Sequence, residues 1–86
     1  MRKKHRKTLD DIFSIPIKAN IGWRDIESLL VSLDAEIKDG RGSRGRIKLN
    51  GVWAVFHRPH PQKETDKGAV KAMREFFNAA GVSENG

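Results

Sequence analysis

The dipeptide Asn50-Gly51 is the feature that most restricts how this chain folds. Asn-Gly between two runs of alternating residues predicts a β-hairpin with a two-residue turn, because both residues readily adopt the left-handed backbone that such a turn requires. Asp39-Gly40 and Gly42-Ser43 also consist of turn-forming residues. They predict an earlier turn, with one more strand before the hairpin. The sequence therefore predicts an antiparallel meander, with strands at about 35–39, 44–49 and 52–57.

A two-residue turn also determines which residues of the hairpin face one another. One set of facing pairs is apolar, so we expect it to lie against the helices: Leu49 with Val52, Ile47 with Ala54, and Gly45 with Phe56. The alternate set is mainly cationic, so we expect it to face solvent: Lys48 with Trp53, Arg46 with Val55, and Arg44 with His57.

Two amphipathic helices flank these strands. Apolar residues recur at three- and four-residue steps from Trp23 to Leu33, which predicts a helix with one face against a core. A second helix is expected from Asp66, a favourable N-cap, to about Ala80, with Gly81 as its stop and a buried stripe that includes Phe77. Two such helices and a half-polar sheet predict an α+β fold: a three-stranded antiparallel sheet with two helices on one face, in the order α-β-β-β-α, after a short N-terminal extension.

The N-terminal extension is strongly basic. Its first seven residues contain five Lys and Arg and no acid, so we expect residues 1–7 to be disordered. A short helix is expected at 9–14, after Thr8 and before Pro16. The predicted organisation is a basic extension at 1–20, one folded domain at 21–82 and a C-terminal tail at 83–86.

The charge of the chain is unevenly distributed. Its 86 residues carry a net charge of +6, and residues 40–63 contain six basic side chains but no Asp or Glu. A basic tail plus one basic segment is typical of proteins that bind polyanions. The chain contains no cysteine, which excludes disulfides and suits a reducing cytoplasm, and it has no apolar run long enough to span a membrane.

The solvent face of the predicted hairpin combines cations with an aromatic ring, which suits RNA. Lys and Arg bind phosphates, and an indole offers a platform for an unstacked base. Two alternatives remain open: the cations simply shield the exposed ring of Trp53, or Trp53 and Val55 form a patch that a partner protein covers. The candidate RNA-binding residues are Arg41, Ser43, Arg44, Arg46, Lys48, Trp53 and Arg58.

Two histidines mark the end of the third strand: His57 is its last residue, and His60 follows three residues later. We expect no metal and no other cofactor here, because a His-x-x-His pair needs a third ligand and only Glu64 and Asp66 are near in sequence. Histidine can instead supply the base or the acid for metal-free RNA cleavage, so both are candidate catalytic residues. An exposed histidine with no catalytic role is the competing interpretation.

The segments "DGRGSRGRIKLNG", "VWAVFHRPHP" and "KGAVKAMREFFNAAG" together resemble the HicA-type toxins of HicAB toxin–antitoxin systems, over roughly Trp23 to Val82. The resemblance implies a fold similar to double-stranded RNA-binding domains, mRNA cleavage without a metal, and neutralisation by a cognate HicB-like antitoxin. The family places a catalytic histidine just after its Gly-Ser turn, whereas Gly42-Ser43 is followed by Arg44 and Gly45; His60 matches the family's His-Pro. Two hypotheses therefore stand: an RNA endonuclease that uses His57 or His60, or a binding module without cleavage.

Overall fold

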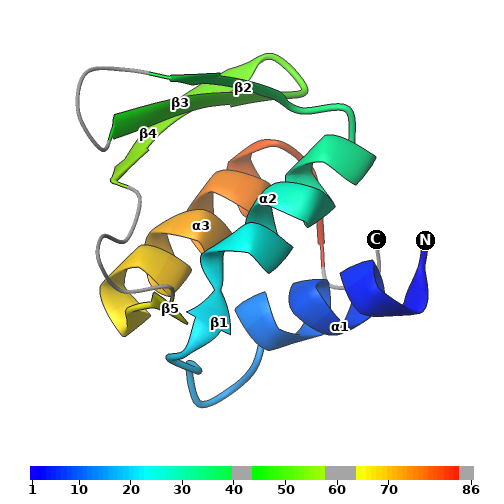
Figure 1. Ribbon diagram of the computed structural model, residues 1–86, viewed down its shortest axis with the longest axis vertical. Helices are drawn as coiled ribbons and strands as arrows, with labels where there is room; N and C mark the ends of the chain where they lie inside the picture. Colours follow the sequence, from blue (N-terminus) through cyan, green and yellow to red (C-terminus); the bar gives the residue numbers. More distant parts are fainter. Residues whose placement is uncertain (40–43, 58–63, 84–86) are drawn as a thin grey trace.

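The computed structural model describes residues 1–39, 44–57 and 64–83 of the chain. Over these residues the chain forms three helices, a three-stranded sheet and a small two-stranded sheet (Figure 1). In chain order the elements are α1 (Lys3–Ile12), β1 (Ile21–Gly22), α2 (Trp23–Ser32), β2 (Glu36–Asp39), β3 (Arg44–Leu49), β4 (Val52–His57), β5 (Glu64–Thr65) and α3 (Lys67–Ala79).

The hairpin of β3 and β4 has the register that the sequence predicts. Leu49 faces Val52 across the turn, and the pairing continues to Arg44 and His57 at the far end. Asn50 and Gly51 both have positive φ angles, 50° and 84°, as a type I′ turn requires. β2 pairs with the other edge of β3, so the sheet order is β2-β3-β4 and every pairing is antiparallel.

Helices α2 and α3 cover one face of this sheet (Figure 1). The Asp66 side chain accepts a hydrogen bond of 2.8 Å from the backbone N–H of Ala69, which caps α3, and Gly81 follows the helix with a φ of 79°. The expected α+β class and element order are thus confirmed. The buried apolar residues of the helices and the sheet form one core cluster, whose members in these elements include Trp23, Ile26, Leu29, Leu30, Ile47, Leu49, Phe56, Val70, Met73, Phe76 and Phe77.

The N-terminal helix differs from the expectation. Residues 1–7 are not disordered as expected: α1 begins at Lys3 rather than Leu9. The cationic first turns lack apolar residues, but Arg6 pairs with Asp10 and Lys7 with Asp11 one turn later, at 3.3 Å and 2.9 Å. Such i,i+4 pairs and the good helix propensity of Lys and Arg extend the helix toward the N-terminus.

Helix α1 packs on the side of α2 and α3 that faces away from the sheet, which makes a third layer (Figure 1). Leu9 and Ile12 are fully buried there. The His5 ring and the Ser28 hydroxyl are hydrogen-bonded at 2.9 Å, which joins α1 to α2. The basic N-terminal segment is therefore part of the packed structure.

The end of α1 is held by α3. The guanidinium of Arg74 donates hydrogen bonds to the carbonyl oxygens of Ile12 and Ser14, at 2.9 Å and 2.7 Å. These carbonyls lie at or after the helix C-terminus, where intrahelical partners are lacking, so the cation satisfies them and complements the helix dipole. Phe13 then stacks on Phe77, with 6.4 Å between ring centroids.

The two-residue strands β1 and β5 were not expected. Ile21 pairs with Thr65 and Gly22 with Glu64, and the backbone N–H of Asn20 also donates to the carbonyl of Thr65 at 3.2 Å. Segments of two residues are too short for the alternation that identifies a strand from sequence. This pair joins the start of α2 to the start of α3 and so aligns the two helices at one end.

We predict that Leu9→Ala lowers the free energy of unfolding of the whole domain by about 2–5 kcal/mol, the usual cost of truncating a buried leucine. Urea denaturation followed by the fluorescence of buried Trp23 measures this. Lys3→Ala, an exposed change on the same helix, is the control and should leave the midpoint unchanged. Equal midpoints for Leu9→Ala and the parent would mean that residues 1–20 do not stabilise the rest.

A second prediction concerns Asp11, whose carboxylate accepts hydrogen bonds of 2.9 Å from both Lys7 and Lys18. Burial opposes ionisation of Asp11, but these hydrogen bonds and charges outweigh it and lower the pKa of the carboxyl below its ordinary value. A carboxyl with a lowered folded-state pKa contributes stability above its unfolded pKa of about 3.9, and that stability is lost as the pH falls through the folded pKa.

Asp11→Asn should therefore destabilise the protein at neutral pH, and the difference from the parent should vanish in acid. Urea unfolding of both proteins from about pH 7 to about pH 2 tests this. Asp10→Asn, which removes the more exposed pair with Arg6, is the matched control and should show a smaller difference. A difference for Asp11→Asn that stays constant into acid would contradict the role of its charge.

Candidate nucleic-acid interface

The face of the sheet that points away from the helices carries the predicted cationic set. Arg44, Arg46, Trp53 and His57 are exposed and Lys48 is half-buried, whereas Ile47 and Leu49 on the opposite face are buried. The side chain of Trp53 is 47% exposed and that of Val55 is 57% exposed. The prediction that this set faces solvent is confirmed, because the turn sets the register and one face must be buried.

The indole of Trp53 lies among cations from two strands. The Nζ of Lys48 is 5.6 Å from the ring centroid and the Cζ of Arg46 is 6.0 Å from it. Lys38 on β2 also contributes, with its Nζ at 5.9 Å. Lys38 belongs to the strand beyond β3, so cations from two neighbouring strands surround the ring.

Lys38 is a residue of this face that the sequence prediction missed. It pairs with Arg46, and therefore lies on the same side of the sheet as Arg46 and Trp53. The sequence between the predicted first and second strands does not define the register of β2 as Asn50-Gly51 defines that of the hairpin. The alternation in β2, where Ile37 points to the core side, is the signal that locates Lys38 on the outer face.

A shallow hollow of about 400 Å³ lies beside the indole. Its lining residues are Arg46, Trp53, Ala54 and Val55. Trp53 and Val55 are both on β4, two residues apart, so they stand on the same side of the sheet. The hollow thus combines an aromatic wall, an aliphatic wall and a guanidinium.

His57 ends β4 on the same face, directly across from Arg44 on β3. Directly opposed residues of an antiparallel pair have Cβ atoms about 4.5–5.5 Å apart. The imidazole and the guanidinium therefore share one corner of the sheet, where one anionic group can contact both. The other candidates Arg41, Ser43, Arg58 and His60 lie outside the described residues.

The described residues contain no group of three or more His, Asp or Glu side chains that could hold a metal ion. None of the helices in the described part of the chain is long and apolar enough to cross a membrane.

The cations of α1 have a different environment from those of the sheet. Lys4 lies 3.9 Å from Asp25, and Arg6 and Lys7 pair with acids on their own helix. Three of the five cations of residues 1–7 therefore have an acidic neighbour in the structure. This segment also lies in the layer opposite the sheet, so the cations of α1 and those of the sheet do not form one continuous surface (Figure 1).

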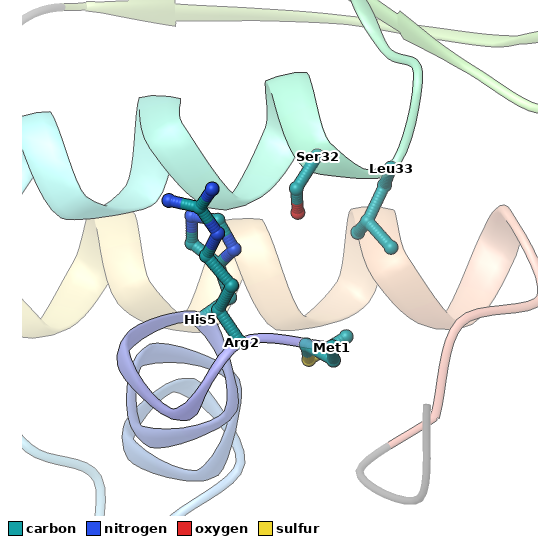
Figure 2. Close-up of a pocket in the computed structure, with 5 residues that line it drawn as sticks. All are labelled: Met1, Arg2, His5, Ser32 and Leu33. Atoms are coloured by element: carbon teal, nitrogen blue, oxygen red, sulfur yellow. The ribbon is translucent and has the colours of Figure 1, made fainter.

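A groove of about 590 Å³ separates the start of α1 from the end of α2. Figure 2 shows His5 of α1, together with Met1 and Arg2 just before the helix, facing Ser32 and Leu33 at the end of α2. The C-terminus of a helix carries partial negative charge, which a cation such as Arg2 complements. The attraction between Arg2 and the end of α2 thus helps to hold the N-terminal segment against α2.

The structure is thus a small α+β domain with a cationic sheet face that displays an indole and a histidine. The family model described as the HicA toxin of bacterial toxin–antitoxin systems matches residues 23–82, and the chain belongs to this family. The match runs from the first residue of α2 to just beyond α3, so α1 lies outside it. No curated protein and no solved structure matches the chain.

Membership of this family makes the chain a toxin-type component of a toxin–antitoxin system, which implies a cognate antitoxin as its partner. The resemblance noted from the sequence motifs is confirmed.

We predict that Trp53 is accessible to small quenchers in the free protein. In a Trp23→Phe variant, which leaves Trp53 as the sole indole, iodide should quench the fluorescence strongly because the ring is exposed and the nearby cations attract the anion. The matched variant Trp53→Phe leaves only buried Trp23 and should be quenched weakly. Equal, weak quenching in both variants would contradict the assignment of the outer face.

Proposed function

We propose that this protein is an RNA-binding toxin whose outer sheet face is the RNA site. The observation that carries the proposal is the grouping of cations around an exposed indole on one open face. Among the described residues of β2, β3 and β4, the side chains on this face include four cations and one carboxylate, that of Glu36. Phosphate contacts of this kind supply most of the affinity for a nucleic acid.

The same face offers a route to metal-free cleavage at the corner of Arg44 and His57. In this reaction the 2′-oxygen of a ribose attacks the adjacent phosphorus, and the bond from phosphorus to the 5′-oxygen breaks. The products are a 2′,3′-cyclic phosphate and a 5′-hydroxyl. A base removes the proton of the 2′-hydroxyl, and an acid donates a proton to the departing 5′-oxygen.

We assign the base to His57, since histidine exchanges protons near neutral pH and this residue is exposed on the RNA face. Arg44, its cross-strand neighbour, would hold the phosphate and stabilise the additional negative charge of the transition state. His60, the other catalytic candidate from the sequence, is proposed as the acid because it follows His57 by three residues.

A second candidate function is binding without cleavage, either of RNA or of the antitoxin. The observation that favours it is that Arg44 and Gly45 stand after Gly42-Ser43, where the resemblance places a catalytic histidine. The cationic face serves this function equally well. In both cases we propose a HicB-like antitoxin as the partner and the cytoplasm as the site of action.

The experiment that separates the two functions is incubation of the purified protein with RNA in EDTA. We predict discrete fragments that end in 2′,3′-cyclic phosphates, and a loss of cleavage rate of about 10²–10⁴-fold in His57→Ala, the usual contribution of a general base. RNA binding by His57→Ala should stay close to that of the parent, because the cations remain.

His5→Ala, purified in the same way, is the control for this experiment. His5 lies on α1 in the layer opposite the sheet, so this variant should cut like the parent. Unchanged cleavage by His57→Ala would remove His57 from the mechanism. Binding without any cleavage by the parent would leave the second function.

A further inference from the structure

The hollow beside Trp53 offers more than the charged side chains that bind phosphates. Phosphates need only charged side chains, whereas this hollow of about 400 Å³ has the indole of Trp53 on one side and Val55 on another. The residue is 47% exposed, and three cations lie within about 6 Å of the centre of its ring. An exposed aromatic surface with cations around its rim is complementary to a neutral, flat aromatic ring whose chain carries a negative charge on either side of it.

We propose that this hollow binds one unpaired nucleobase of single-stranded RNA, stacked on Trp53 with its flanking phosphates on Arg46, Lys48 and Lys38. The inference rests on the proposed function, RNA binding at this sheet face. It deepens that function by naming the structural class of RNA and the residue that selects it.

A base can replace the cations that contact the indole ring in the free protein. A solvated cation–π contact is weaker than the stacking of a base on an aromatic side chain. When a base stacks on the ring, Lys38 and Lys48 remain within reach of the phosphates on either side, because both side chains are long and flexible. Shielding of the ring in the free protein and stacking in the complex are therefore compatible.

This arrangement selects single strands against duplexes. In an A-form duplex the bases are stacked inside the helix, and a protein contacts mainly phosphates and 2′-hydroxyl groups across the minor groove. A duplex can contact Arg46 and Lys48 but cannot place a base on Trp53. We thus expect the opposite preference from the one that a fold similar to double-stranded RNA-binding domains would suggest.

The test is the affinity of the protein for an unstructured 2′-O-methyl oligonucleotide of about 12 nucleotides, compared with a duplex of the same length. The methyl group blocks the attacking hydroxyl, so the oligonucleotide is not cut during the titration. We expect the single strand to bind at least about 10-fold more tightly than the duplex, a ratio within the range of one stacking contact. Inorganic polyphosphate is the base-free probe.

Trp53→Leu removes the aromatic ring but keeps an apolar side chain, and it leaves buried Trp23 as a reporter of the fold. We expect this variant to bind the single strand about 5- to 150-fold more weakly, with its salt dependence and its polyphosphate binding unchanged. Trp53→Phe, which keeps a smaller ring, should lose less. Lys48→Gln is the matched control: it should weaken binding to all three probes and reduce the slope of the salt dependence by about 0.7.

The outcomes separate this inference from the proposed function. Parent-like binding of the single strand by Trp53→Leu, with weaker binding by Lys48→Gln, would overturn the base site and leave RNA binding intact. Equal affinity for single strand and duplex would do the same. If the parent binds none of the RNA probes, both proposals fail, and an effect of Trp53→Leu on antitoxin affinity alone would make the face a protein contact.

Discussion

The constraint on which the rest of the structure depends is the register of the Asn50-Gly51 turn. A slip of one residue would exchange the two faces of the hairpin, so that Trp53 and the cations would meet the helices while Ile47 and Leu49 would meet water. The turn is also tied to the helix layer, because the Asn50 side chain donates a hydrogen bond of 2.8 Å to the carbonyl of Ala80 at the end of α3. The same turn thus sets the register of the β3–β4 hairpin and, through Asn50, anchors the hairpin to the helix layer.

The elements that the sequence predicts correctly are those whose signals are local. The turn residues define β3 and β4, and three- and four-residue apolar spacing defines α2 and α3. The elements that it misses depend on distant contacts. β1 and β5 depend on the pairing of Ile21 with Thr65, which are far apart in sequence, and the full length of α1 depends on charge pairs and on its contact with α2. Propensity within a short window does not contain this information.

The candidate site divides in the same way. The outer-face positions of Arg44, Arg46, Lys48, Trp53 and His57 follow from the turn, and they are confirmed. Lys38 was missed because its position depends on the pairing of β2 with β3, which is not defined by a two-residue turn. The roles of the candidates, and the positions of Arg41, Ser43, Arg58 and His60, stay predictions.

The two basic segments of the chain illustrate why a charge count alone does not identify a binding surface. In α1, Arg6 and Lys7 precede acids by four residues on the same helix, so helical geometry itself places opposite charges together. In β3, Arg46 and Lys48 alternate with apolar residues and lie beside an aromatic ring instead. Ion pairs neutralise a cation, whereas contact with an indole leaves its charge available to a phosphate. The electrostatic attraction of this protein for a polyanion is therefore expected to concentrate on the sheet, although the N-terminal segment has the higher density of positive charge in sequence.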